Sequence, residues 1–236
     1  MGGIFHLIYT INQVECDNIS GTCGIKNQHL PIDVVYSWVN GSDTSQRKSL
    51  ELYNNTKTES YALNPNRYAD NDELRYSIRS LYKHAPWVRN IYLLTNGQIP
   101  WWLDIDHPRI KVVTHAQVFQ NKSHLPTFNS NAIEANMHLI EGLSEHFIYF
   151  NDDVMFGRDV RPEDYVTSAG YKIRFAWGLP KCVNVHGWVA QLCNSNKLVT
   201  SVWGPAQRNV MPHYPALLNR KIIRELIERL YLNSLI

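Results

Sequence analysis

The sequence has no strong charge of either sign, no long apolar run and few cysteines. Its 236 residues carry 23 basic and 21 acidic side chains, which gives a formal net charge of +2. This balance does not favour binding to a polyanion, so we expect no nucleic acid partner. No window reaches the roughly 18 consecutive apolar residues of a membrane span. Residues 1–13 are apolar but lack a basic n-region and a small-residue cleavage site, so they do not resemble a signal peptide.

The signatures of several common enzyme classes are absent too. The sequence contains no G-x-x-x-x-G-K-[ST], no G-x-G-x-x-G and no G-x-S-x-G. These absences argue against a P-loop nucleotidase, a dinucleotide-binding enzyme and a serine hydrolase.

The four cysteines form two close pairs, Cys16 with Cys23 and Cys182 with Cys193. Neither pair has the C-x-x-C spacing of a zinc site. Two local disulfides in a secretory compartment and free buried thiols fit the spacing equally well. Four N-x-S/T sequons favour a lumenal protein: Asn18, Asn40, Asn54 and Asn121. If the full-length protein is anchored in a membrane, we expect the anchor to lie outside this chain.

Strands and helices alternate over much of the chain. β-Branched and aromatic runs predict strands at residues 32–39, 91–95, 110–114 and 147–150. Apolar residues at a helical period predict helices from about residue 70 to just before Pro86, from about 129 to 143, and from 219 to 232. We expect an irregular lead-in at residues 1–30, a short helix and a loop between 44 and 67, and irregular structure at 160–207. The pattern predicts an α/β domain over residues 31–236, with a mostly parallel sheet flanked by helices.

Two adjacent carboxylates follow the predicted strand at 147–150. Asp152 and Asp153 would lie at the carboxyl edge of the sheet, where open α/β sheets bind ligands. Their hard oxygen atoms suit Mg²⁺ or Mn²⁺ on a nucleotide diphosphate, although a plain strand-terminal turn fits as well. Asp104 and Asp106 also spell D-x-D, but they lie in a polar link and we interpret them as a turn.

Other polar residues have a functional and a structural interpretation. Asp33 lies inside an apolar strand and must have a partner if it is buried. Glu134 lies within a helix, and without other information an exposed helix face is the simpler interpretation. His213 lies between Pro212 and Pro215, which suits a positioned acid or base but also a surface loop. A cluster near the first helix and the end of a strand either binds phosphate or is solvated: Arg67, Asp72, Glu73, Arg75 and Asn96.

Four segments resemble the conserved regions of the Stealth proteins. The segment IDVVYSWVNGSD, residues 32–43, resembles the first region. Residues 67–103 resemble the second region, residues 125–157 the third, and residues 208–230 the start of the fourth. The run from 67 to 164 is especially similar to the animal Golgi members of the family. Only about fifty residues separate the third region from the fourth, and the fourth stops at Ile236, so we expect it to be truncated.

The resemblance implies a Rossmann-like nucleotide-sugar transferase core and a set of site residues. Asp33, Glu134, Asp153 and His213 match positions that the family uses in catalysis or metal-linked nucleotide-sugar binding. Asp153 would hold Mg²⁺ or Mn²⁺, with Asp152 and Glu134 as candidates beside it. His213 would act as the base, because an imidazole exchanges protons near neutral pH. The cluster at the first helix and Asn96 would bind substrate.

The resemblance also implies a reaction and partners. The animal members transfer GlcNAc-1-phosphate from UDP-GlcNAc to the 6-hydroxyl of mannose on high-mannose glycoproteins, and UMP leaves. They lie in the Golgi lumen and have regulatory subunits. We expect the same reaction here. The alternatives are a degenerate member that binds glycans without turnover and a polysaccharide hexose-1-phosphate transferase like the bacterial relatives.

Overall fold

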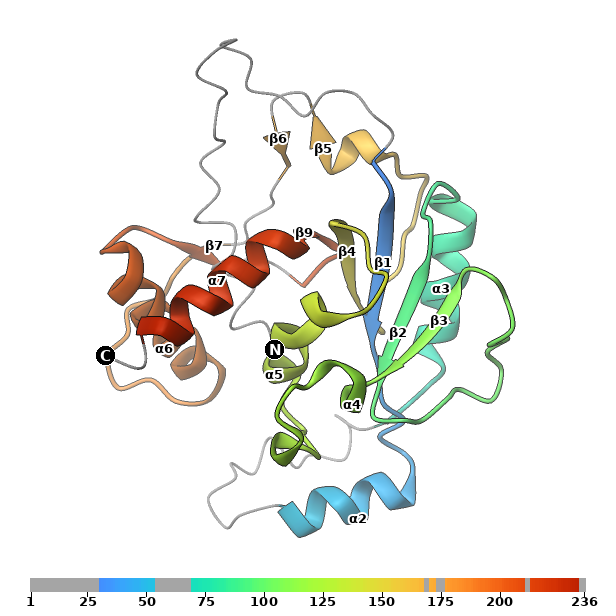
Figure 1. Cartoon of the computed structure of the whole chain (residues 1–236), viewed down its shortest axis with the longest axis horizontal. Helices are drawn as coiled ribbons and strands as arrows, with labels where there is room; N and C mark the ends of the chain where they lie inside the picture. The colour runs from blue at the N-terminus through green and yellow to red at the C-terminus, as the bar shows by residue number, and fades with distance from the viewer. Residues whose placement is uncertain (1–29, 54–68, 168–169, 173–176, 211–212, 234–236) are drawn as a thin grey trace.

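The fold is built on a five-stranded sheet with the order β3-β2-β1-β4-β9. The computed structural model describes residues 30–53, 69–167, 170–172, 177–210 and 213–233. The strands are β1 (Ile32–Ser37), β2 (Ile91–Thr95), β3 (Ile110–Thr114), β4 (His146–Asn151) and β9 (Ala216–Asn219). The first four are parallel, and β9 pairs antiparallel with β4 (Figure 1). The predicted α/β fold with a mostly parallel sheet is therefore confirmed.

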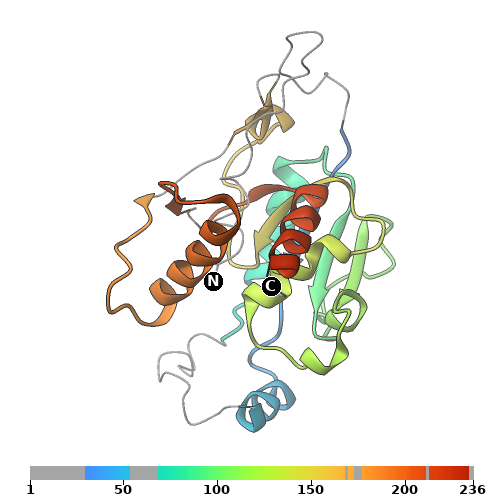
Figure 2. The same ribbon diagram turned by 60° about the vertical axis from the view of Figure 1, so that its left-hand side comes forward.

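Helices cover both faces of the sheet and make a three-layer structure (Figures 1 and 2). One face is covered by α3 (Glu73–His84). The other is covered by α4 (His115–Val118), α5 (Ser130–Asn136) and α7 (Arg220–Asn233). The remaining helices are α2 (Thr44–Tyr53), α6 (Gly187–Trp203) and the 3₁₀ turns η3 (Lys122–His124), η4 (Met137–Leu139) and η5 (Pro162–Asp164). Two small antiparallel pairs join β5 (Val166–Thr167) to β6 (Gly170–Tyr171) and β7 (Trp177–Gly178) to β8 (Asn209–Val210).

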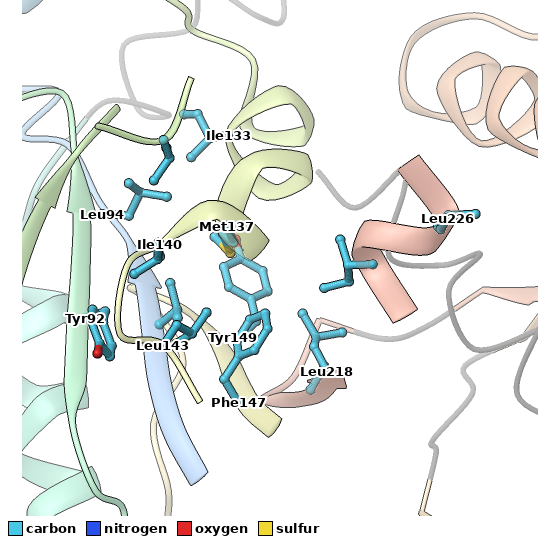
Figure 3. Packing of buried hydrophobic residues seen from close by; sticks show 14 of the residues in the cluster. Tyr92, Leu94, Ile133, Met137, Ile140, Leu143, Phe147, Tyr149, Leu218 and Leu226 are labelled. Atoms are coloured by element: carbon cyan, nitrogen blue, oxygen red, sulfur yellow. The ribbon is translucent and has the colours of Figure 1, made fainter. Parts of the chain in front are cut away.

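Alternate residues along each central strand enter two different cores. In β4, Ile148 and Phe150 pack with α3, whereas Phe147 and Tyr149 face α5 and α7. This is the period of two that a pleated strand requires, and burial on both faces explains why the strand is apolar throughout. Figure 3 shows Phe147, Tyr149 and Met137 among the residues of the second core. Both faces of the sheet are thereby buried against helices.

Several local predictions are confirmed, with small shifts at the ends of elements. Helix α3 begins at Glu73 after Asp72, not after Asp70 or Asn71, and ends before Pro86 as predicted. The segment with Asp104 and Asp106 is a turn, in which the Asp106 amide donates to Asp104 Oδ1 at 3.2 Å. The predicted lead-in at residues 1–30 lies almost wholly outside the described residues, so the domain boundary stays a prediction.

The prediction of irregular structure at 160–207 is wrong for its second half. Residues 187–203 form α6, a helix of 17 residues. Leu192, Cys193 and Val199 are buried at helical spacing, but the polar residues between them obscure the period. Cys193 also forms a disulfide with Cys182, which decides between the two interpretations of this pair. Cys16 and Cys23 lie outside the described residues. Among the described helices, none is long and apolar enough to cross a membrane.

Candidate active site at the carboxyl edge of the sheet

The order of the strands identifies one place on the sheet as the best position for a ligand. From β1 the chain builds outward through β2 to β3 and then returns to place β4 on the other side of β1. The direction of construction therefore reverses between β1 and β4, and ligands of open α/β sheets bind at the carboxyl ends of such a strand pair. Ser37 and Asn151, the last residues of these strands, are paired neighbours. This edge is the lower one in Figure 1.

Four carboxylates from two loops lie near one another at this edge. Asp152 and Asp153 follow β4, and Asp70 and Glu73 lie at the start of α3. Burial, followed by the negative charges of Asp153, Glu73 and Asp70, raises the pKa of Asp152 to about 6. The mutual repulsion means that the cluster is best stabilised by a cation.

The structure brings His213 to the same cluster from 60 residues further along the chain. Its Nδ1 atom lies 3.9 Å from Oδ1 of Asp153, and the Asp153 side chain is 57% exposed. His213 precedes β9, which runs antiparallel to β4 and therefore begins where β4 ends. The imidazole and the carboxylate are thus both open to a ligand at the edge.

A buried polar group lies directly beneath this edge. The side chain of Tyr149 connects the ends of β1 and β4 to α5: its hydroxyl lies 3.0 Å from Ser37 Oγ, 3.0 Å from Asn151 Oδ1 and 3.1 Å from Glu134 Oε1. One phenol hydrogen can serve only one acceptor at a time, so the two oxygens of Asn151 and Glu134 compete for it. Glu134 is 1% exposed, and its Oε2 atom is buried without a hydrogen-bond partner.

The surroundings of Glu134 raise the pKa of its carboxyl group. Burial raises its pKa to about 7, and the Tyr149 hydrogen bond opposes this only in part. A buried carboxylate with an unpartnered oxygen destabilises the fold when it ionises. Such a group is typical of a functional site, because stability alone would favour an uncharged residue there.

Glu134→Gln should therefore change how stability depends on pH. Between the ordinary pKa of 4.5 and the folded value of about 7, the unfolded chain releases a proton that the folded chain retains. The wild-type free energy of unfolding should consequently fall, relative to that of Glu134→Gln, by about 2–3 kcal/mol between pH 5 and pH 8. Urea denaturation across this range without divalent cations measures the difference. Glu141→Gln, at an exposed position, is the control for the loss of one charge. If the difference in the free energy of unfolding between wild type and Glu134→Gln does not change with pH, the raised pKa of Glu134 is contradicted.

Those predicted substrate-binding residues that the structure describes lie at or near this edge. Asp72 has φ 63° and ψ 24° before α3, a left-handed conformation that Asp tolerates better than most residues. Both carboxylate oxygens of Glu73 accept hydrogen bonds from Asn71 at 2.8 Å. The Arg75 guanidinium lies 5.9 Å from the ring centre of Trp101, and Asn96 donates to Gln46 at 2.7 Å. Arg67 lies outside the described residues.

The structure does not bring Asp33 to this edge. Asp33 is the second residue of β1, at the opposite, amino edge of the sheet, and it is 0% exposed. Its carboxylate accepts two hydrogen bonds from Arg89, at 2.8 and 2.6 Å, and one each from the amides of Asn90 and Ser144, at 3.0 and 2.7 Å. These contacts tie β1 to the segments before β2 and β4, so we interpret Asp33 as a structural residue and not as a catalytic one.

Sequence reasoning missed Tyr149, Ser37 and Asn151 as parts of the site. Tyr149 lies in an apolar strand, so the sequence pattern predicts only a core residue. Its ring is indeed part of the core. The available signal was its hydroxyl group, because a buried tyrosine usually needs a hydrogen-bond partner. That the partner is Glu134 could not be seen from the sequence.

The donor set fits a hard divalent cation that is shared with a substrate. No three His, Cys, Asp or Glu side chains of the described residues are arranged as a complete metal site. Mg²⁺ is usually held by one or two carboxylates together with substrate phosphates and water, and Asp152 and Asp153 supply such a pair. The repulsion within the carboxylate cluster favours a cation there.

Two protein-family models match this chain. Conserved region 1 of the Stealth proteins matches residues 30–58, and conserved region 2 matches residues 67–174. The chain belongs to the Stealth family. The two matches contain β1 to β6, and hence the β1–β4 edge with Asp152, Asp153 and Glu134. The segment assigned above to a separate third region, residues 125–157, falls inside the region 2 match, so that assignment is wrong. The assignment of residues 208–230 to the fourth region stays a prediction.

Named Stealth relatives come from animals and from bacteria. The mouse N-acetylglucosamine-1-phosphotransferase subunits alpha/beta are 54% identical over 138 residues, which is 55% of this chain and 11% of that protein. An exopolysaccharide phosphotransferase of Streptomyces coelicolor is also 54% identical, over 141 residues, 60% of this chain and 23% of that protein. Another from the same organism is 41% identical over 212 residues, 86% of this chain and 35% of that protein. The chain thus spans about a tenth to a third of these relatives.

Proposed function

We propose that this Stealth chain transfers GlcNAc-1-phosphate from UDP-GlcNAc to the 6-hydroxyl of mannose on high-mannose glycoproteins, which makes the precursor of a mannose-6-phosphate tag. The observation that carries the proposal is the convergence of Asp152, Asp153 and His213 at the β1–β4 edge. The named relatives are phosphotransferases, and the mouse relative transfers N-acetylglucosamine-1-phosphate by its name. We further propose that Mg²⁺ or Mn²⁺ is the cofactor.

The reaction is a substitution at the phosphorus that carries the sugar. The acceptor oxygen forms a bond to this phosphorus, the bond to the oxygen of the UMP phosphate breaks, and the sugar–phosphate bond is kept. His213 takes the proton of the attacking hydroxyl. Asp152 and Asp153 would hold the divalent cation, which neutralises charge on the diphosphate when it is bound. Positioning and charge neutralisation supply most of the catalysis in such transfers.

The nucleotide that is released tests the proposal directly. The chain should convert UDP-GlcNAc and methyl α-mannoside, with Mg²⁺, into UMP and a phosphodiester that ³¹P NMR detects. EDTA should stop the reaction. Release of UDP would show transfer from the anomeric carbon and contradict the proposal. Absence of both products, with donor still bound, would favour the degenerate glycan-binding alternative.

His213→Ala should lower the rate of transfer by about 10²–10⁴-fold, the usual contribution of a general base, and leave donor affinity nearly unchanged. Calorimetry with UDP-GlcNAc and Mg²⁺ measures donor binding, and UMP release measures transfer. If binding falls in step with transfer, His213 belongs to the phosphate or metal site and Glu134 becomes the better candidate for the base. His124→Ala, at an exposed turn, is the control.

A polysaccharide hexose-1-phosphate transferase is the second candidate function. The observation that favours it is the match to a bacterial exopolysaccharide phosphotransferase over 86% of this chain. A bacterial relative also equals the mouse relative in identity, at 54%. Transfer to a capsular oligosaccharide but not to methyl α-mannoside would select this candidate.

The proposed setting is the Golgi lumen, with the full-length protein anchored by a segment outside this chain and accompanied by regulatory subunits. The Cys182–Cys193 disulfide supports an oxidising compartment. Antibody staining of tagged full-length protein against a Golgi marker tests the location.

A further inference from the structure

A pocket lies between the segment that follows Asp153 and the residues that follow His213. Its volume is about 210 Å³, below the roughly 300–1,000 Å³ of pockets for drug-sized ligands, so it suits one sugar-sized ring. Its lining includes Met155, two residues after Asp153, and Tyr214, one residue after His213. The remainder of its lining includes Phe156, Arg158, Asp164 and Lys172.

The lining has the chemistry that a sugar ring requires. Phe156 and Tyr214 provide aromatic surface for the C–H groups of a ring. Arg158 and Lys172 are exposed donors, and neither side chain has a hydrogen-bond or ion-pair partner within the part of the chain that the structure describes. Asp164 Oδ2 accepts from the Arg161 amide at 2.9 Å, and its carboxylate adds an acceptor to the pocket.

The wall of the pocket is fixed before any ligand binds. The Phe156 amide donates to Ser80 Oγ at 2.9 Å, and the Val160 amide donates to the His84 carbonyl at 2.9 Å. The Trp87 indole donates to the Val160 carbonyl at 2.7 Å. The segment from 156 to 160 is therefore fastened to α3 and the residues after it, and a preformed site loses little conformational entropy on binding.

We propose that this pocket binds the sugar ring that carries the attacking hydroxyl, an inference that rests on the proposed function. In an in-line phosphoryl transfer, the attacking and leaving oxygens lie on opposite sides of the phosphorus. A diphosphate at the β1–β4 crevice can place UMP toward β1 and β2. The acceptor then enters from the side of β9, where His213 and the pocket lie. The GlcNAc ring of the donor has the same chemical groups and is the alternative ligand for this pocket.

Gly157 allows the pocket to be filled without disturbing its wall. This glycine lines the pocket, does not have a positive φ, and a Cβ at its position would meet no atom within 4 Å. Because Gly157 lines the pocket, Gly157→Phe should narrow it, and Gly157→Ala is the matched control that adds one methyl group. Arg158→Met removes a donor from the surface of the same pocket as an independent variant.

Saturation-transfer NMR with methyl α-mannoside tests the pocket without any turnover. The wild-type chain and Gly157→Ala should show transfer to the sugar protons, and Gly157→Phe should lose it. In the transfer assay, Gly157→Phe should raise the KM for this acceptor at least about tenfold, and Arg158→Met should raise it less. UDP-GlcNAc affinity should stay unchanged.

Three other outcomes are decisive for the pocket or for the proposed reaction, and the first of them overturns the inference. A mannoside signal that is absent from wild type or persists in Gly157→Phe would do so. Loss of UDP-GlcNAc affinity in Gly157→Phe, with UMP affinity retained, would assign the pocket to the donor sugar. If wild type releases no UMP but the mannoside signal depends on Gly157 as described, the proposed reaction fails and the sugar pocket stands.

Discussion

Asp153→Asn should lower the rate of sugar-phosphate transfer by about 10²–10³-fold or more and leave the fold intact. The substitution removes a charge from the diphosphate site while it preserves the volume of the side chain, and losses of this size follow when a group that stabilises transition-state charge is removed. The Asp153 side chain is 57% exposed, and among the described residues its one ion-pair contact is the 3.9 Å approach to His213. Its loss also relieves repulsion on Asp152, so no destabilisation is expected.

Asp159→Asn is a matched control for this substitution. Asp159 is likewise exposed and likewise lies against a histidine, with 2.8 Å between its Oδ1 and Nδ1 of His84, but it is not part of the carboxylate cluster. Turnover should be measured as UMP release with saturating Mg²⁺, and folding by thermal denaturation. Wild-type turnover by a folded Asp153→Asn variant would remove Asp153 from the proposed site.

Asp33→Asn should have the largest effect on stability and lower the free energy of unfolding by about 2–4 kcal/mol. The carboxylate is fully buried and accepts hydrogen bonds from four donor groups. An amide has only one acceptor oxygen, so its NH₂ group would face donors, and the charge that compensates Arg89 is lost. Because the Arg89 side chain is 43% exposed, water reduces part of the cost.

The same variant separates a structural from a catalytic role for Asp33. Urea denaturation measures the loss of stability, and turnover is measured at low temperature, where the variant is still folded. Turnover per folded molecule should equal that of wild type. A normal stability with lost turnover would restore Asp33 to the catalytic residues. Asp106→Asn, in an exposed turn, should change neither quantity.

The strands and most of the helices could be predicted from the sequence because their signals are local. The buried strands are continuous β-branched and aromatic runs, and α3 and α7 have clear apolar stripes. Helix α6 was missed because its apolar residues are interrupted by polar ones and its burial depends on packing against α7. The short β9 was also missed, since four residues between a proline and a helix carry too weak a signal.

The sequence by itself determined the family, the alternating α/β pattern and the pair of carboxylates after β4. Long family motifs and the local period of the apolar residues are enough to predict these three features. Only the tertiary structure decided which polar residues share a site. His213 meets Asp153 because β9 runs antiparallel to β4, whereas Asp33 lies at the opposite edge because it begins its strand. Glu134 acquires its raised pKa from burial under Tyr149, and burial is a property of the packed layers and not of the helix that carries the residue.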